Sequence, residues 1–129
     1  MQINAVNIIP YKLPLRQNWI TSNCHLSSRS GWLVEITTDS GNSGYGDCAP
    51  LPSAGTEWPQ QAYLCLQRYR DKKQHGSAVE ALQNLPLAHA TPAARNGIET
   101  ALLDLISQAE KKTLRCWLNP FAHNRIQLN

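Results

Sequence analysis

The sequence predicts an α+β fold, in which a three-stranded antiparallel sheet is followed by a helical bundle. Two segments rich in β-branched residues, at about 3–13 and 31–38, are typical of strands. A turn over 39–42 separates the second segment from a shorter strand at about 43–48. Beyond residue 56 the apolar residues recur at helical spacing. Strands therefore precede helices without alternating with them, which favours α+β over a βαβ architecture.

The strand region carries three informative local signals. Pro10 donates no backbone hydrogen bond, so we expect the first strand at a sheet edge. The turn Asp39-Ser40-Gly41-Asn42 contains residues that tolerate positive φ or bond their own backbone, which predicts a tight hairpin. Gly44 and Gly46 weaken an ordinary strand, and they indicate that another backbone or a ligand comes close there.

Two loops are expected beside the strands. Residues 16–30 are polar and lack sustained periodicity, which predicts a long loop, and long structureless loops are usually functional or mobile. After the hairpin, Pro50 and Pro52 fix the path of the chain and remove two backbone donors. A stiff loop at the end of a hairpin is suited to presenting side chains to a partner.

The second half of the chain is predicted to be helical. The expected helices span about 57–74, 78–84, 92–110 and 114–118. Thr56 is the expected cap of the first helix, with Glu57 in its first turn. Ser77 and Glu80 form a capping box that opens the second helix. The third helix has an apolar stripe that we expect to face the sheet.

Size and composition indicate one globular domain with a modest core. The 129 residues are 42% hydrophobic and 16% charged, and the formal charge of +3 comes from scattered basic residues. No basic run is interleaved with aromatic residues, which argues against nucleic-acid binding. No apolar stretch is long enough to span a bilayer, and residues 1–7 lack the features of a signal peptide. We therefore expect a cytoplasmic protein without nucleic-acid or membrane partners.

Cysteine and histidine residues are spread widely along the chain. The cysteines are Cys24, Cys48, Cys65 and Cys116. Their uneven spacing favours free thiols over a disulfide framework. His75, His89 and His123 are too far apart for a zinc motif, and we interpret them as surface residues.

No catalytic or metal-binding pattern is recognisable among the ionisable residues. The carboxylates lack the spacing of a divalent-cation site. Asp104 lies inside an apolar helical stripe, so we expect it to be buried against a backbone group or an arginine, with Arg29 and Arg95 as candidates. Cys24 and His25 are sequence neighbours, whereas a nucleophile and its base normally come from separate elements. We expect no catalytic residue and no metal ligand in this chain.

The hairpin followed by Gly44-Tyr45-Gly46-Asp47-Cys48-Ala49-Pro50-Leu51-Pro52 resembles the N-terminal capping domain of the enolase superfamily. The resemblance is to the muconate-cycloisomerase and mandelate-racemase branch, which includes dipeptide epimerases. Ala54-Gly55-Thr56-Glu57 favours o-succinylbenzoate synthase-like members, and the run from Arg95 to Leu105 is similar to the family's long-helix signature. The resemblance implies a capping domain at 1–124 and the first strand of a barrel at 125–129.

The resemblance also implies that the catalytic barrel is absent from this chain. In the family, the barrel supplies lysine acid–base groups and three carboxylates that hold Mg²⁺, which stabilises an enolate formed from a carboxylate substrate. This chain has no position that matches those groups. The full-length enzyme is thus implied to be a Mg²⁺-dependent lyase or isomerase, whereas this chain alone is expected to be inactive and to bind no cofactor.

Two loops of the family's capping domain close over the barrel mouth, select the substrate and exclude water. By position, the corresponding residues here are Trp19, Ile20, Thr21, Ser22, Asn23, Leu51, Pro52, Ser53, Ala54 and Gly55. Taken singly, Trp19 and Leu51 fit an ordinary packing role equally well, and the pairing of the two loops is what favours a lid.

Two functions from different classes follow. The chain is either the specificity cap of an o-succinylbenzoate synthase-like enzyme or a free-standing, non-catalytic binding or interaction protein that kept the cap fold. An independent Cys/His enzyme is a third, less favoured possibility. Without a barrel, the surface that faces it is exposed and apolar, which predicts self-association.

Overall fold

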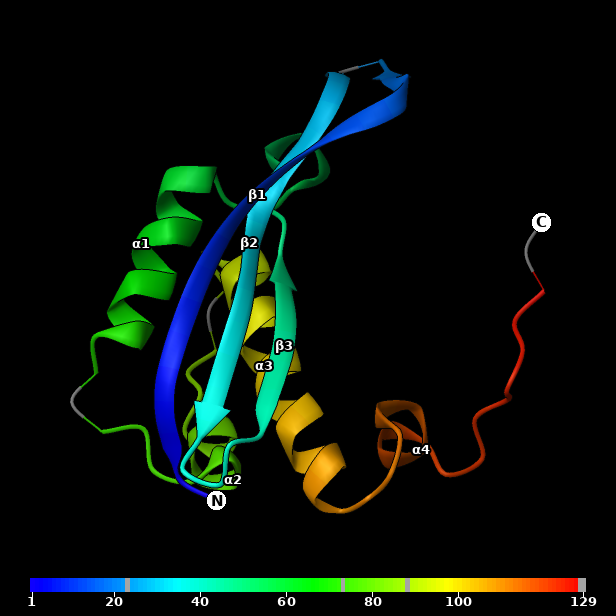
Figure 1. Cartoon of the computed structure of the whole chain (residues 1–129). Helices are drawn as coiled ribbons and strands as arrows, with labels where there is room; N and C mark the ends of the chain where they lie inside the picture. The colour runs from blue at the N-terminus through cyan, green and yellow to red at the C-terminus, as the bar shows by residue number, and fades with distance from the viewer. Residues whose placement is uncertain (23, 73, 88, 128–129) are drawn as a thin grey trace.

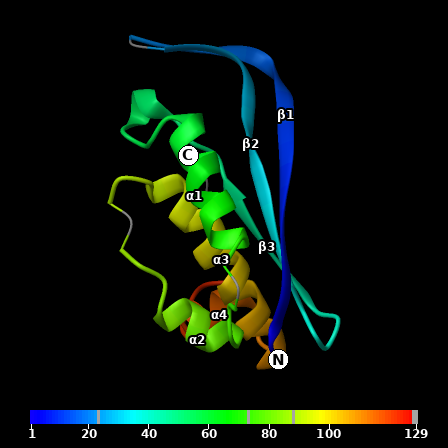
Figure 2. The same ribbon diagram turned by 90° about the vertical axis from the view of Figure 1, so that its left-hand side faces the viewer.

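In the computed structural model, which describes residues 1–22, 24–72, 74–87 and 89–127, three antiparallel strands form one sheet in the order β1–β2–β3 (Figure 1). The strands are β1 (Ile3–Thr21), β2 (Cys24–Thr38) and β3 (Ser43–Cys48). They are followed by a 3₁₀ turn and helices, namely η1 (Pro52–Ala54), α1 (Pro59–Arg70), α2 (Ala78–Gln83), α3 (Pro92–Ala109) and α4 (Leu114–Leu118). The helices lie on one side of the sheet (Figure 2), so the predicted α+β class is confirmed.

The expected loop at 16–30 is wrong, because this stretch continues the β1–β2 hairpin. The register of the pairing shifts between Pro14 and Trp19, and pairing continues at the end of the hairpin, where Trp19 lies opposite Leu26 and Thr21 opposite Cys24. Figure 1 shows this two-stranded arm reaching beyond β3 and α3. Most side chains of the arm are exposed. A ribbon without a buried face needs no apolar alternation, so its sequence carries none of the usual strand signal.

The sheet and α3 pack backbone against backbone at β3. A Cβ atom added to Gly46 would lie 1.9 Å from the carbonyl oxygen of Gly97, and one added to Gly44 would lie 2.2 Å from that of Ala101. The close approach expected at Gly44 and Gly46 is therefore made by a helix backbone. The apolar stripe of α3, which includes Ile98, is buried in this contact as expected.

Polar side chains of α3 then reach around the outer edge of β3. The hydrogen bonds run from Tyr45 N to Asp104 Oδ2 (3.0 Å), from Gln108 Nε2 to Ser43 O (3.0 Å) and from Asn96 Nδ2 to Asp47 O (3.1 Å). Asp104 thus binds a backbone group, which was one of the two alternatives expected, although it is only partly buried and not buried as predicted. The prediction that Arg29 or Arg95 pairs with Asp104 is wrong, since Arg29 donates to backbone carbonyls and Arg95 pairs with Glu99.

The first helix begins later than expected. Trp58 is the N-cap of α1, and Pro59 follows at the first helical position, where its missing N–H costs nothing. Glu57, expected inside that helix, is instead buried and accepts hydrogen bonds from the backbone N–H groups of Ala93 (3.0 Å) and Ala94 (2.8 Å). Its carboxylate therefore satisfies the free N–H groups at the start of α3.

Of three further predictions from the local sequence, the structure confirms one and contradicts two. The capping box of Ser77 and Glu80 opens α2 as predicted. Thr56 is not a helix cap, because its Oγ1 accepts from Leu51 N at 2.5 Å. α1 ends at Arg70 instead of near residue 74.

We expect Gly46→Ala to lower the free energy of unfolding by about 1–3 kcal/mol, because α3 has to move away from β3 to admit the methyl group. Chemical denaturation of the variant and the wild type measures this difference. Gly41→Ala is the comparison, since its Cβ would meet nothing within 4 Å and only the positive φ of 82° opposes it. That strain costs about 1–2 kcal/mol. Equal stability of Gly46→Ala and the wild type would contradict the backbone contact.

Candidate functional site at the hairpin tip

The far end of the β1–β2 hairpin and the η1 turn enclose a shallow cavity of 110 Å³. Its lining consists of Trp19, Thr21, Cys24, Leu26, Leu51, Ser53 and Ala54. The structure therefore brings together two segments that are well separated in the sequence. Five of the lining residues belong to the predicted lid, whereas Cys24 and Leu26 were not predicted to be part of it.

Strand alternation decides which tip residues face this cavity. Side chains two apart on a strand, and those directly opposite on its partner, share one face of the ribbon. Trp19 and Thr21 lie on the same face as Cys24 and Leu26, and these four residues line the cavity. Ile20 is on the other face and is 69% exposed, compared with 53% for Trp19. The tip thus presents apolar surface on both faces.

The other predicted lid residues that the structure describes are not part of the cavity lining. Ser22 is exposed at the tip, and Pro52 is partly buried at the start of η1. Gly55 ends η1 with a φ of 91° and donates its N–H to Pro52 O at 3.0 Å. A side chain at this left-handed position would be strained, which explains the glycine. Asn23 lies outside the described residues.

The loop that carries η1 is fixed to the hairpin by Arg29. Its guanidinium donates to the carbonyl oxygens of Ala49 (2.6 Å) and Pro50 (2.9 Å). Within the loop, Thr56 Oγ1 accepts from Leu51 N, and Ala54 N donates to Leu51 O at 2.9 Å. The sequence predicted other roles for Arg29 and Thr56, because their actual partners are backbone atoms of a loop whose path only the assembled fold defines.

A hydrogen bond between two side chains stiffens the root of the arm, where the β1–β2 hairpin leaves the three-stranded part of the sheet. Tyr11 Oη donates to Asp47 Oδ1 at 2.6 Å, which links β1 to β3 across the central strand. The phenol passes over Gly31, where an added Cβ would lie 2.6 Å from Tyr11 Oη. Burial, followed by the bond to Asp47, raises the pKa of Tyr11 to about 12. The phenol therefore remains a neutral donor at physiological pH.

The side chains around the tip can shape an opening but are not arranged for proton transfer. Cys24 and His25 are adjacent on a strand, so their side chains point to opposite faces. Cys48 is fully buried, and burial is the largest of the effects that raise the pKa of its thiol to about 12, so it stays protonated. Among the described residues, no three His, Cys, Asp or Glu side chains are close enough together to hold a metal ion.

The histidines differ from the expectation at one position. His89 and His123 are exposed, but His75 is partly buried against the ring of Tyr69, with ring centroids 4.9 Å apart. This part of the chain folds back on β1, where Ile3 N donates to Gly76 O at 3.0 Å. Nothing in the local sequence around His75 predicts that contact.

Solved structures that share this fold include enzymes of the mandelate racemase/muconate lactonizing branch of the enolase superfamily. A dipeptide epimerase from Methylococcus capsulatus, complexed with Mg and a dipeptide, has a TM-score of 0.80 at 24% identity over 92% of this chain and 35% of that chain. An o-succinylbenzoate synthase from Thermosynechococcus elongatus, with Mg in its active site, has a TM-score of 0.62 at 26% identity over 81% of this chain and 30% of that chain.

The family model of the MenC N-terminal domain matches residues 3–105, and the chain belongs to this family. The o-succinylbenzoate synthase of Vibrio cholerae serotype O1 is 34% identical over 70 residues, which are 54% of this chain and 21% of that protein. The cis-3-hydroxy-L-proline dehydratase of Roseibium aggregatum is 40% identical over 57 residues, which are 42% of this chain and 15% of that protein. The match thus spans about a fifth of these relatives or less. No helix within the described residues is both long and apolar enough to cross a membrane.

We expect Arg29→Met to loosen the η1 loop, because the variant loses two charge-assisted hydrogen bonds to backbone carbonyls. Hydrogen exchange at the amides of Leu51, Ala54 and Gly55 should become roughly tenfold faster. Arg16→Met, at an exposed position on β1, is the matched control and should leave these rates unchanged. Unchanged exchange in Arg29→Met would show that Arg29 does not hold the loop.

Proposed function

We propose that this chain is the substrate-specificity cap of an o-succinylbenzoate synthase-like enzyme of the enolase superfamily. The cavity between the hairpin tip and η1 is the observation that carries this proposal. In it, two predicted lid segments meet around the half-exposed ring of Trp19. Family membership and the relatives described above support the proposal at the level of the enzyme class.

In this proposal the cap works joined to a barrel domain. Mg²⁺ bound by that barrel would stabilise the negative charge that develops on a small carboxylate substrate. The cap's part is physical: the tip and η1 cover the substrate, exclude water and leave room for some substrate shapes and not others. The barrel would begin near residue 125, and residues 128–129 of its expected first strand lie outside the described residues.

The side chains at the tip explain why the cap would select the substrate while the barrel would carry out the chemistry. Apart from Cys24, the cavity is lined by residues without an ionisable group, so it can select shape and polarity but cannot act as an acid or base. The isolated chain is therefore expected to be inactive. Tight Mg²⁺ binding and turnover of a carboxylate by the isolated chain would contradict the proposal.

A chimera tests the cap role directly. In it, this chain replaces the corresponding domain of the o-succinylbenzoate synthase of Vibrio cholerae. We expect Trp19→Ala to lower kcat/KM of the chimera by roughly tenfold, because the mouth loses a large apolar wall that excludes water. Steady-state kinetics measure kcat and KM separately.

Leu87→Ala in the same chimera is the matched control, since Leu87 is 76% exposed and belongs to neither lid segment. It should leave both constants unchanged. If Trp19→Ala and Leu87→Ala behave alike in a folded, active chimera, the hairpin tip is not part of a lid. A folded chimera that binds no substrate would instead favour the free-standing binding protein.

The isolated chain should self-associate, because apolar side chains after α3 are left in water. Leu118 is 61% exposed, Phe121 91% and Ile126 85%. Burial of such side chains is favourable, so they should find a second copy when no barrel covers them. Light scattering is expected to show an apparent mass that rises with concentration, and Phe121→Ser should reduce this rise. A monomer of constant mass up to the highest concentration would contradict an uncovered interface.

A further inference from the structure

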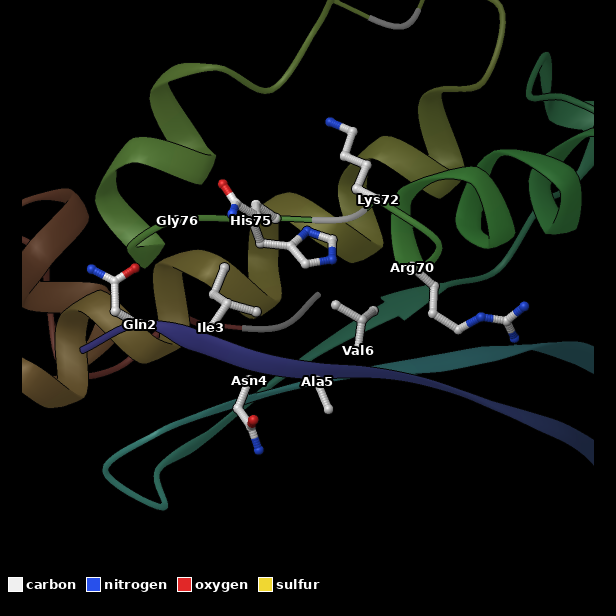
Figure 3. Close-up of a pocket in the computed structure, with 10 residues that line it drawn as sticks. Gln2, Ile3, Asn4, Ala5, Val6, Arg70, Lys72, His75 and Gly76 are labelled. Carbon is white, nitrogen blue, oxygen red and sulfur yellow. The ribbon is translucent and has the colours of Figure 1, made fainter.

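At the end of the molecule opposite the hairpin tip, a second cavity lies between the end of α1, the following loop and α2. It has a volume of 150 Å³ and is lined by Tyr69, Lys72, Gln74, His75, Ala81 and Asn84. On the other side of His75, a larger open cavity of 460 Å³ faces the start of β1. Figure 3 shows the imidazole of His75 on the side of β1 to which Ile3 and Val6 point.

Two polar atoms of the smaller cavity's lining lack a hydrogen-bond partner among the residues that the structure describes. They are Tyr69 Oη and His75 Nδ1, and both atoms are buried. The whole of Tyr69 is only 5% exposed. Buried polar atoms are normally hydrogen-bonded, because an unpaired one loses its hydration without compensation. The pair therefore indicates a hydrogen-bond partner outside the described residues.

The charges around this cavity favour an anion. The ammonium group of Lys72 lies 5.1 Å from the centroid of the Tyr69 ring. Burial raises the pKa of Tyr69 to about 12, so the phenol is a hydrogen-bond donor at neutral pH. Among the described residues, the lining contains no carboxylate. The carboxylate of Glu80 on α2 is not part of the lining, and it accepts a hydrogen bond from Ser77 N at 2.8 Å.

We propose that this cavity binds a small oxyanion, of the size of phosphate or a short carboxylate, through Tyr69 Oη and His75 Nδ1 as donors and Lys72 as the counter-charge. The volume of 150 Å³ admits such an ion. The site does not depend on the proposed cap function, because α2, which supplies Ala81 to its lining, lies at the end of the sheet away from the hairpin tip (Figure 2).

Isothermal titration of the full 129-residue chain tests the proposal. Inorganic phosphate and acetate are titrated separately at constant ionic strength, which distinguishes a phosphate-type site from a carboxylate site. We expect saturable binding of at least one of them. Tyr69→Phe keeps the ring and removes the donor, so it should weaken binding roughly tenfold. His75→Phe, which removes the second donor, should also weaken it, with circular dichroism confirming the fold.

Tyr63→Phe is the matched control. Tyr63 is also on α1, but its ring stacks on Trp32 at 5.4 Å, outside this cavity. It should bind the ion as the wild type does. No saturable binding of either ion to the wild type would mean that the cavity holds water alone and would overturn the proposal. Equal affinities of Tyr69→Phe and Tyr63→Phe would place any bound ion elsewhere and overturn it as well.

Discussion

The contact between α3 and β3 is the constraint on which the rest of this structure depends. Because Gly44, Gly46 and Gly97 carry no side chains, the helix backbone lies directly on the strand backbone. At that distance the polar side chains of α3 reach the outer edge of β3 and bind its free backbone groups. An edge satisfied in this way is protected from pairing with another chain. One set of glycines thus sets both the packing of the core and the limit of the sheet.

The hairpin arm projects from this anchored core. β1 and β2 pair beyond the end of β3, and their tip lies beyond α1 and α3, next to η1 (Figure 1). Tyr11 ties the root of the arm to Asp47, and Arg29 ties its side to the η1 loop. A paired ribbon held at two points places Trp19 more accurately than a structureless loop would. This stiffness suits a surface that closes over a substrate and must meet it in one geometry.

The two ends of the molecule have different chemistry. The cavity at the tip is lined by apolar and neutral side chains, whereas the one beside α2 offers donors and a positive charge. The first suits the proposed role as a cap that selects substrate shape, and the chain belongs to the MenC N-terminal domain family. The second uses residues of the loop after α1, remote from the tip, so a ligand there would meet the domain independently of the substrate.

The sequence by itself determined the features that arise within one segment: the fold class, the Ser77 capping box, the apolar stripe of α3 and the close approach at Gly44 and Gly46. Backbone preference and periodicity act over a few residues, and they leave a local pattern. Only the tertiary structure decided that residues 16–21 and 24–30 belong to strands and that Glu57 caps α3. The same is true of the burial of His75 against Tyr69. These features depend on partners far along the chain, because an exposed ribbon, a buried carboxylate and an aromatic contact acquire their neighbours only when distant segments assemble.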